Sequence, residues 1–146
     1  MQTADHGLRI GRGTTWVADM SWILIAVGSA FGGISRHACG LWIARLGSPF
    51  PWGTFAVNVL GSLGIGIVAA ALVNASGRNE SAWLRDFAMI GFLGGFTTFS
   101  AFSWQTLQLL RDGKLLIAGA NVLASVMICL IACWIGFSAG ARLASS

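Results

Sequence analysis

Charged side chains are scarce in this 146-residue sequence, because Asp, Glu, Lys and Arg together make up only 10% of it. A soluble domain carries about 25% charged residues. Hydrophobic residues make up 55% of the chain, and its mean hydropathy is +0.75. A chain with the length of roughly one domain cannot bury that much apolar surface in its own core. The composition therefore excludes a soluble enzyme and a disordered chain, and it predicts a membrane protein.

Ligand and catalytic groups are also few. The cysteines are Cys39, Cys129 and Cys133, which form no CxxC pair and lie inside apolar runs, so a disulfide scaffold is excluded. Cys129 and Cys133 have a spacing that a metal ion could use, but no His or carboxylate nearby completes a ligand set. We interpret all three as small apolar packing residues. The only histidines, His6 and His37, have no acidic partner within a span, which excludes an enzyme. The sequence has no basic run with interleaved aromatic residues, so nothing in it indicates a nucleic-acid partner.

Four long apolar runs dominate what is present. Each exceeds the roughly 20 residues that an α-helix needs to cross a hydrocarbon core of about 30 Å, whereas a β-barrel needs many short alternating segments. The sequence thus predicts an all-α, multi-pass membrane protein with four transmembrane helices and a lipid bilayer around it. Short connections predict antiparallel neighbours. The predicted spans are 22–45, 52–73, 83–110 and 115–142, which form a transmembrane domain over 21–146 after a polar, flexible arm over 1–20.

Basic residues give only a weak signal for orientation. Counts of Lys and Arg near the spans set which loops stay in the cytoplasm. One side of the membrane receives Arg9, Arg12, Arg78, Arg85 and Arg142, and the other receives Arg45, Arg111 and Lys114. Two interpretations stay open. The chain inserts in both orientations, or a small bias selects one of them.

A single charged side chain, Arg36, lies well within a predicted span. Charges in a membrane are costly and usually functional. No acidic residue inside the spans can pair with Arg36. The guanidinium therefore either snorkels to one interface or faces an anion in a polar cavity.

Two spans carry polar stripes with a four-residue period, which places each stripe on one helix face. The stripes are Thr54, Asn58 and Ser62 in the second span, and Asn121, Ser125 and Cys129 in the fourth. One interpretation is a shared polar track through the membrane. The other is a set of hydrogen bonds between helices.

The third span contains an unusual segment over 94–103. Two glycines followed by Thr97 and Thr98 weaken a helix at mid-membrane, so we expect a break there. Carbonyl oxygens freed by such a break suit an alkali cation. Phe99 and Phe102 are three residues apart and share a face, and the positive edges of their rings could line an anion path. Ordinary aromatic packing is the alternative for the two rings.

Small residues recur at four-residue spacing, which lets helices pack closely. These pairs are Gly28 with Gly32, Gly91 with Gly95, and Gly136 with Gly140. Because four short spans enclose little interior, close association with a second copy is expected.

Three motifs, in this order along the chain, resemble the CrcB or Fluc family of small fluoride channels. They are GGISR over 32–36, WGTFAVNVLG over 52–61 and GGFTTFSAFS over 94–103. The resemblance covers about residues 22–142. One departure is Ala101, where the family signature usually has a threonine, so that a hydroxyl is missing from any polar track.

The resemblance implies an antiparallel, dual-topology homodimer in the bacterial inner membrane. Its implied function is passive export of fluoride, which reduces fluoride toxicity inside the cell. It implies an ion pathway that includes Phe99, Phe102 and Asn58, with Ser100, Thr98 and Ser125 on a polar track and Arg36 in the first span. It also implies a structural Na⁺ at the dimer interface, held by the backbone carbonyls of Gly94 and Thr97.

Two alternative functions fit the sequence less well. A small dual-topology multidrug or cation exporter would need a carboxylate within the membrane, whereas Asp19 precedes the first span and Asp86 begins the third. A membrane subunit without transport activity would leave Arg36, Asn58 and the unusual third span unexplained.

Overall fold

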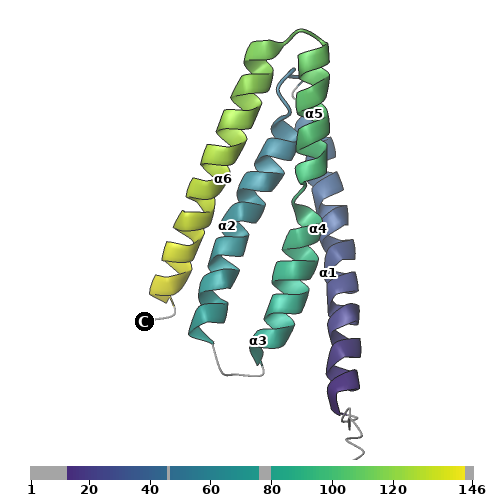
Figure 1. The fold of residues 1–146 in the computed structure, drawn as a ribbon, viewed down its shortest axis with the longest axis vertical. Coiled ribbons are helices and arrows are strands. Elements are labelled where there is room, and N and C mark those ends of the chain that lie inside the picture. The colour runs from purple at the N-terminus through teal and green to yellow at the C-terminus, as the bar shows by residue number, and fades with distance from the viewer. Residues whose placement is uncertain (1–12, 46, 76–79, 144–146) are drawn as a thin grey trace, which may run out of the picture.

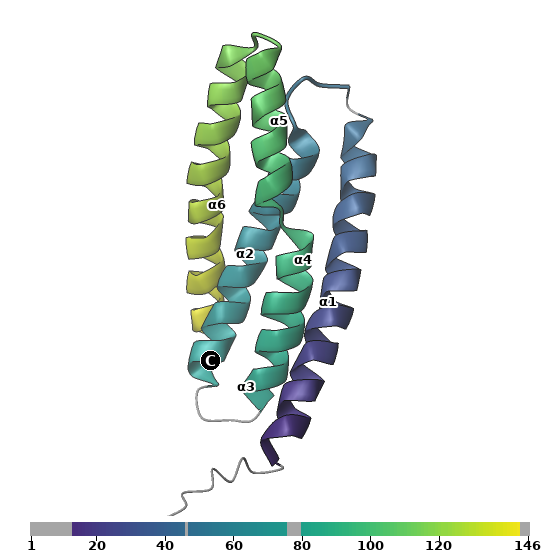
Figure 2. The same ribbon diagram turned by 45° about the vertical axis from the view of Figure 1, so that its right-hand side comes forward.

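The computed structural model describes residues 13–45, 47–75 and 80–143, and every regular element in these ranges is a helix. The elements in chain order are α1 (Gly13–Ala44), α2 (Trp52–Asn74), α3 (Glu80–Trp83), η1 (Leu84–Leu93, a π-helix), α4 (Gly94–Phe96), α5 (Phe99–Arg111) and α6 (Leu115–Leu143). Figures 1 and 2 show them as an elongated bundle in which α3, η1, α4 and α5 follow one another as a single long rod beside the rods of α1, α2 and α6. The predicted all-helical fold is confirmed.

Three of these rods are long and apolar enough to cross a membrane, judged over the described residues. They are Trp52–Asn74, Leu84–Arg111 and Leu115–Leu143. The predicted span over 22–45 corresponds to α1, which is 32 residues long, and it stays a prediction.

The first helix starts earlier than predicted. Residues 1–12 of the predicted arm lie outside the described residues, but residues 13–20 belong to α1 and are helical. No Pro or Gly occurs between Gly13 and Gly28, so no local breaker ends the helix as it continues toward the N-terminus. Polar composition alone was therefore a poor guide to the helix boundary.

A tight turn connects α5 to α6 and makes them antiparallel neighbours. Gly113 has φ +73°, a conformation that favours glycine. The backbone N–H of Lys114 donates to the Leu109 carbonyl at 2.9 Å, and that of Gly113 donates to the Leu110 carbonyl at 3.1 Å. This pair of bonds is the Schellman arrangement that ends a helix at a glycine.

Glycines form the closest contacts between helices. A Cβ atom on Gly136 of α6 would lie 2.1 Å from the Leu63 carbonyl oxygen of α2. A Cβ atom on Gly32 of α1 would lie 2.1 Å from the Phe92 carbonyl oxygen of η1, and Gly28 and Gly91 meet in the same seam. The predicted role of small residues in close helix packing is confirmed at these seams.

Large apolar side chains cover the outside of the bundle, while its few buried polar residues lie inside. Trp22, Leu116 and Leu123 are among the exposed hydrophobic residues, whereas Asn121 and Ser125 are buried. A soluble protein rarely exposes apolar patches of this extent. This distribution fits a surface that faces lipid.

Candidate ion pathway

The helical backbone stops at Phe96 and resumes at Phe99, between α4 and α5 (Figure 1). Thr97 has φ −80° and ψ 159°, and Thr98 has φ −153° and ψ 112°, so both residues are extended. The Thr98 hydroxyl then caps α5 by accepting a hydrogen bond from the Ala101 N–H at 3.2 Å. β-Branched residues after two glycines favour this local departure from helix.

Asn58 of α2 takes over the backbone groups that the interruption releases. Its Oδ1 accepts a hydrogen bond from the Thr98 N–H at 2.8 Å, and its Nδ2 donates to the Thr98 carbonyl at 3.1 Å. In a continuous helix the Thr98 N–H would bond the Gly94 carbonyl, which is therefore released. Because an amide nitrogen carries two protons, Asn58 keeps one more N–H to donate.

Arg36 of α1 binds the other extended residue. Its Nη1 donates to the Thr97 carbonyl oxygen at 3.2 Å, and the side chain is half-buried. Among the described residues, Arg36 has no acidic partner in an ion pair. The guanidinium thus brings an uncompensated positive charge next to the interruption.

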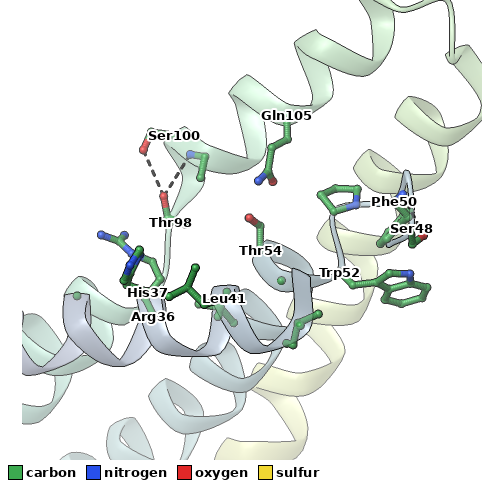
Figure 3. Close-up of a pocket in the computed structure, with 17 residues that line it drawn as sticks. Arg36, His37, Leu41, Ser48, Phe50, Trp52, Thr54, Thr98, Ser100 and Gln105 are labelled. Carbon is green, nitrogen blue, oxygen red and sulfur yellow. Dashed lines mark hydrogen bonds between the residues drawn. The ribbon is translucent and has the colours of Figure 1, made fainter. Parts of the chain in front are cut away.

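A cavity of about 850 Å³, here called the Arg36 cavity, opens beside this guanidinium (Figure 3). Figure 3 shows Thr98 bonded to Ser100, and Thr54 opposite Gln105 across the cavity. The Thr98 and Ser100 hydroxyl oxygens are 3.2 Å apart. Gln105 lines the cavity with a buried Oε1 atom that has no hydrogen-bond partner among the described residues. Sequence reasoning missed Gln105, because a helical spacing alone does not show which of several neighbouring polar residues faces a cavity.

A second cavity of about 460 Å³, here called the Phe99 cavity, lies between α2, α5 and α6 and the segment that leads into α5. It brings together most of the residues that the sequence singled out. Its lining includes Asn58, Gly94, Thr97, Thr98, Phe99, Phe102 and Ser125. Arg36 and Ser100 line the Arg36 cavity instead, and Thr98 lines both cavities. The Asn58–Thr98 contact therefore lies where the two cavities adjoin.

The two predicted pore phenylalanines contact each other at the Phe99 cavity. Their ring centroids are 5.4 Å apart, and the ring planes are inclined by 45°. The Phe99 side chain is 77% exposed, while Phe102 is half-buried. Such a tilted pair presents ring edges, which carry partial positive charge, as well as faces.

A chain of hydrogen bonds joins α6 to α5 beside the Phe99 cavity. The Asn121 Nδ2 donates to the Thr106 hydroxyl at 2.8 Å, and that hydroxyl donates to the Phe102 carbonyl at 2.8 Å. The Ser125 hydroxyl is 3.4 Å from Asn121 Oδ1, to which it donates. Asn121 thus forms a hydrogen bond between helices, which was one of the two interpretations of the polar stripe on this span. Thr106 was missed, because its partner lies on another helix.

The chemistry of the backbone oxygens at the interruption suits a hard cation. The Gly94 carbonyl lacks its usual helical donor, and the Thr97 carbonyl keeps a second lone pair beside Arg36. No group of three or more His, Cys, Asp or Glu that could hold a metal ion occurs in the described part of the chain. Two carbonyl oxygens do not complete the coordination shell of a cation, so a bound ion would need further oxygens.

Comparison with known proteins decides the family. Residues 23–137 match the family described as CrcB-like protein, Camphor Resistance (CrcB). The chain belongs to this family. Among its relatives, the fluoride-specific ion channel FluC of Opitutus terrae is 47% identical over 125 residues, which cover 85% of this chain and 95% of the relative. The FluC proteins of Paramagnetospirillum magneticum and Geotalea uraniireducens are 48% and 49% identical, over 80% and 78% of this chain and 92% and 91% of their own lengths.

Membership in the CrcB-like family agrees with the apolar helices of the structure, and the chain is a multi-pass membrane protein. The relatives are named as ion channels rather than enzymes, in agreement with the predicted absence of enzymatic function. The carboxylate of Asp86 is buried and paired with Arg85 at 2.8 Å, and it lines neither cavity. It therefore does not offer the free intramembrane carboxylate that a proton-coupled exporter needs.

Proposed function

We propose that this CrcB-like protein is a fluoride channel of the bacterial plasma membrane, which lets fluoride leave the cell passively and so lowers fluoride toxicity. The observation that carries the proposal is the Asn58–Thr98 contact. It fixes the Asn58 amide at the wall of the cavity that also has Phe99 and Phe102 in its lining, and leaves one N–H without an acceptor among the described residues. The names of the relatives supply the identity of the ion.

Fluoride is small and strongly hydrated, so a pathway must replace its water with strong donors at little reorganisation cost. The proposed donors are the Asn58 amide and the hydroxyls of Thr98, Ser100 and Ser125, with the ring edges of Phe99 and Phe102 between them. None of these groups is acidic, so none repels an anion. Arg36 adds a positive charge at the cavity that adjoins the Asn58–Thr98 contact, which favours anions over cations.

The functional unit in this proposal is an antiparallel, dual-topology homodimer, in which the third span is interrupted at mid-membrane. Two features of the single chain support a second copy. Phe99, a proposed pathway residue, is largely exposed, and large apolar side chains are exposed on every rod. In an oppositely oriented copy, the same surface would complete the wall beside Phe99.

A sodium ion at the dimer interface is part of the same proposal. The carbonyls of Gly94 and Thr97 from both copies would hold it, which doubles the oxygens that one chain supplies. When bound, the ion would add a fixed positive charge and tie the two interrupted spans together. The guanidinium of Arg36 shares the Thr97 carbonyl, so we expect the remaining lone pair of that oxygen to face the cation.

Efflux from liposomes that contain the purified protein tests the proposed function. Fluoride and chloride would be measured with ion-selective electrodes after a potassium ionophore is added. The ionophore lets K⁺ leave with the anion, so that no opposing membrane potential builds up. We expect rapid fluoride release and no chloride release. Release of neither ion from folded protein would contradict the channel function, and equal release of both would contradict fluoride selectivity.

A further inference from the structure

Two free thiols line the Phe99 cavity, and the proposed conduction gives them no role. Cys129 and Cys133 lie on α6, are half-buried and form no disulfide. They are four residues apart, so they lie on the same helix face as Ser125. Cys39, the third cysteine, lies on α1 and lines neither the Arg36 cavity nor the Phe99 cavity.

We propose that Cys129 and Cys133 form a two-thiolate binding site for a soft metal ion, mercury(II), and that an ion bound there blocks the pathway. The part of the proposal that concerns blocking depends on the proposed function, whereas the binding site does not. Side chains four apart on a helix have Cβ atoms about 5–6 Å from each other. A two-coordinate ion can therefore lie between the two sulfurs without unwinding α6.

The ligand set selects the metal. Zn²⁺ prefers four ligands in a tetrahedron, and the described residues hold no group of three or more His, Cys, Asp or Glu. The remaining polar groups at the cavity include Asn58, Ser62 and Ser125, whose amide and hydroxyl groups suit hard ions. Thiolates bind soft ions preferentially. Two thiolates without a third ligand therefore favour an ion that is stable in linear, two-coordinate geometry.

Charge balance points the same way. The reaction is Hg²⁺ + 2 RSH → Hg(SR)₂ + 2 H⁺, in which two S–H bonds break, two Hg–S bonds form and no electrons are transferred. The product is neutral, so it does not place a charge among Leu93, Leu130 and Val126, which line the same cavity. A monovalent ion such as Ag⁺ would leave a net negative charge there.

Oxidation is a poorer fit than metal binding for the same two thiols. A disulfide requires Cβ atoms about 3.5–4.5 Å apart, which is shorter than the spacing of neighbours one helical turn apart. We therefore expect mild oxidants to leave Cys129 and Cys133 reduced. A bridging ion spans the longer gap.

Binding is tested on the full-length purified protein with Hg²⁺ itself as the probe. Thiol titration and the ultraviolet absorbance of the mercury–thiolate bond would give the stoichiometry. We expect one Hg²⁺ per chain to consume two thiols with high affinity. Cys129→Ser and Cys133→Ser should each weaken binding by about 10²-fold or more, because the second thiol acts at high effective concentration. Cys39→Ser is the matched control and should retain the tight site.

Two results would overturn the site. One is tight binding that persists in the Cys129→Ser, Cys133→Ser double variant, and the other is tight binding that disappears in Cys39→Ser. Comparable binding of Zn²⁺ would contradict the two-coordinate geometry. Each variant can be checked for folding by its elution as the same oligomer as the unmodified protein.

Fluoride efflux with and without Hg²⁺ tests the block, with each variant compared with its own untreated flux. We expect Hg²⁺ to stop efflux through the unmodified protein and Cys39→Ser, but not through the double variant. Tight binding without loss of flux would show that the site lies outside the pathway, and it would overturn the block. Absence of fluoride efflux before any mercury is added would instead contradict the proposed function, while the binding measurement would still decide the site.

Discussion

The side chain of Asn58 bonds both backbone groups of Thr98, forty residues away, by accepting from its N–H and donating to its carbonyl. This pairing satisfies polar groups that would otherwise lack partners where α4 ends and α5 begins. It also fixes the amide that we propose as an anion donor. Structure and proposed conduction therefore depend on the same side chain.

Replacing that amide by a carboxylate tests this dependence. In Asn58→Asp, the acid has no N–H to give to the Thr98 carbonyl, and its negative charge repels both that oxygen and a passing anion. A rise of about 1.4 kcal/mol in the barrier to conduction lowers a rate tenfold. The lost bond to the part-buried Thr98 carbonyl is worth about 0.5–1.5 kcal/mol, and the repulsion by the new charge adds to it. We therefore expect fluoride efflux from liposomes to fall by at least about tenfold.

The control is the same change at Asn74, which ends α2 and donates to the Ala70 carbonyl of its own helix at 2.9 Å. Asn74→Asp should leave efflux within about twofold of the unmodified protein. Equal losses in both variants would indicate that charge on α2, rather than the Asn58–Thr98 pairing, controls conduction.

Phe102→Ile tests the ring edges. Isoleucine keeps apolar bulk at the Phe99 cavity but removes the aromatic ring and its contact with Phe99. We expect slower fluoride efflux with an unchanged oligomer, measured by efflux and by size-exclusion chromatography with light scattering. Phe137→Ile on α6, which lines neither named cavity, is the control and should conduct normally. Unchanged flux through Phe102→Ile would remove this ring from the pathway.

Gly136→Ala tests the seam between α2 and α6. The added Cβ would lie 2.1 Å from the Leu63 carbonyl oxygen, so the two helices must separate. We expect a loss of stability of about 1–3 kcal/mol, measured as a lower unfolding temperature in detergent. Gly119→Ala on the same helix meets nothing within 4 Å and should be neutral or slightly stabilising. Similar destabilisation by both changes would indicate that the substitutions act within α6 itself, and not on the contact between α2 and α6.

Sequence periodicity predicted those parts of the molecule that one helix determines by itself. The bounds of α2 and α6 follow from apolar length, because the runs end at Pro51, Asn74 and Lys114. Phe99 and Phe102 share a cavity because three residues bring side chains back to one face. A period of this kind needs no information about neighbouring helices.

The parts that depend on two helices could not be predicted in the same way. Arg36 was recognised as an unpaired charge, but its partner, the Thr97 carbonyl, is 61 residues away and depends on how α1 packs. Ser100 follows Phe99 directly, yet it lines the Arg36 cavity, because adjacent residues on a helix point about 100° apart. Gln105 was missed for the same reason.

The near balance of basic residues at the two ends of the bundle makes membrane orientation sensitive to single charges. Arg45 follows α1, and Arg111 and Lys114 flank the turn between α5 and α6, at the same end of the bundle in Figure 1. Arg85 lies near the start of η1 and Arg142 near the end of α6, at the opposite end. In a background without the native cysteines, Ser48→Cys near the first end should react with an impermeant thiol reagent from both sides of the membrane if topology is dual.

Changing Asp112 to Lys in that background adds positive charge beside Arg111, so this end should shift toward the cytoplasm. External labelling of Ser48→Cys should then fall and fluoride efflux should drop, because antiparallel dimers need both orientations. Asp112→Asn removes the acid without adding a base and is the matched control, for which we expect a smaller shift. Labelling of Ser48→Cys from one side only, together with efflux that Asp112→Lys leaves unchanged, would contradict the dual-topology dimer and leave a channel built from chains of one orientation.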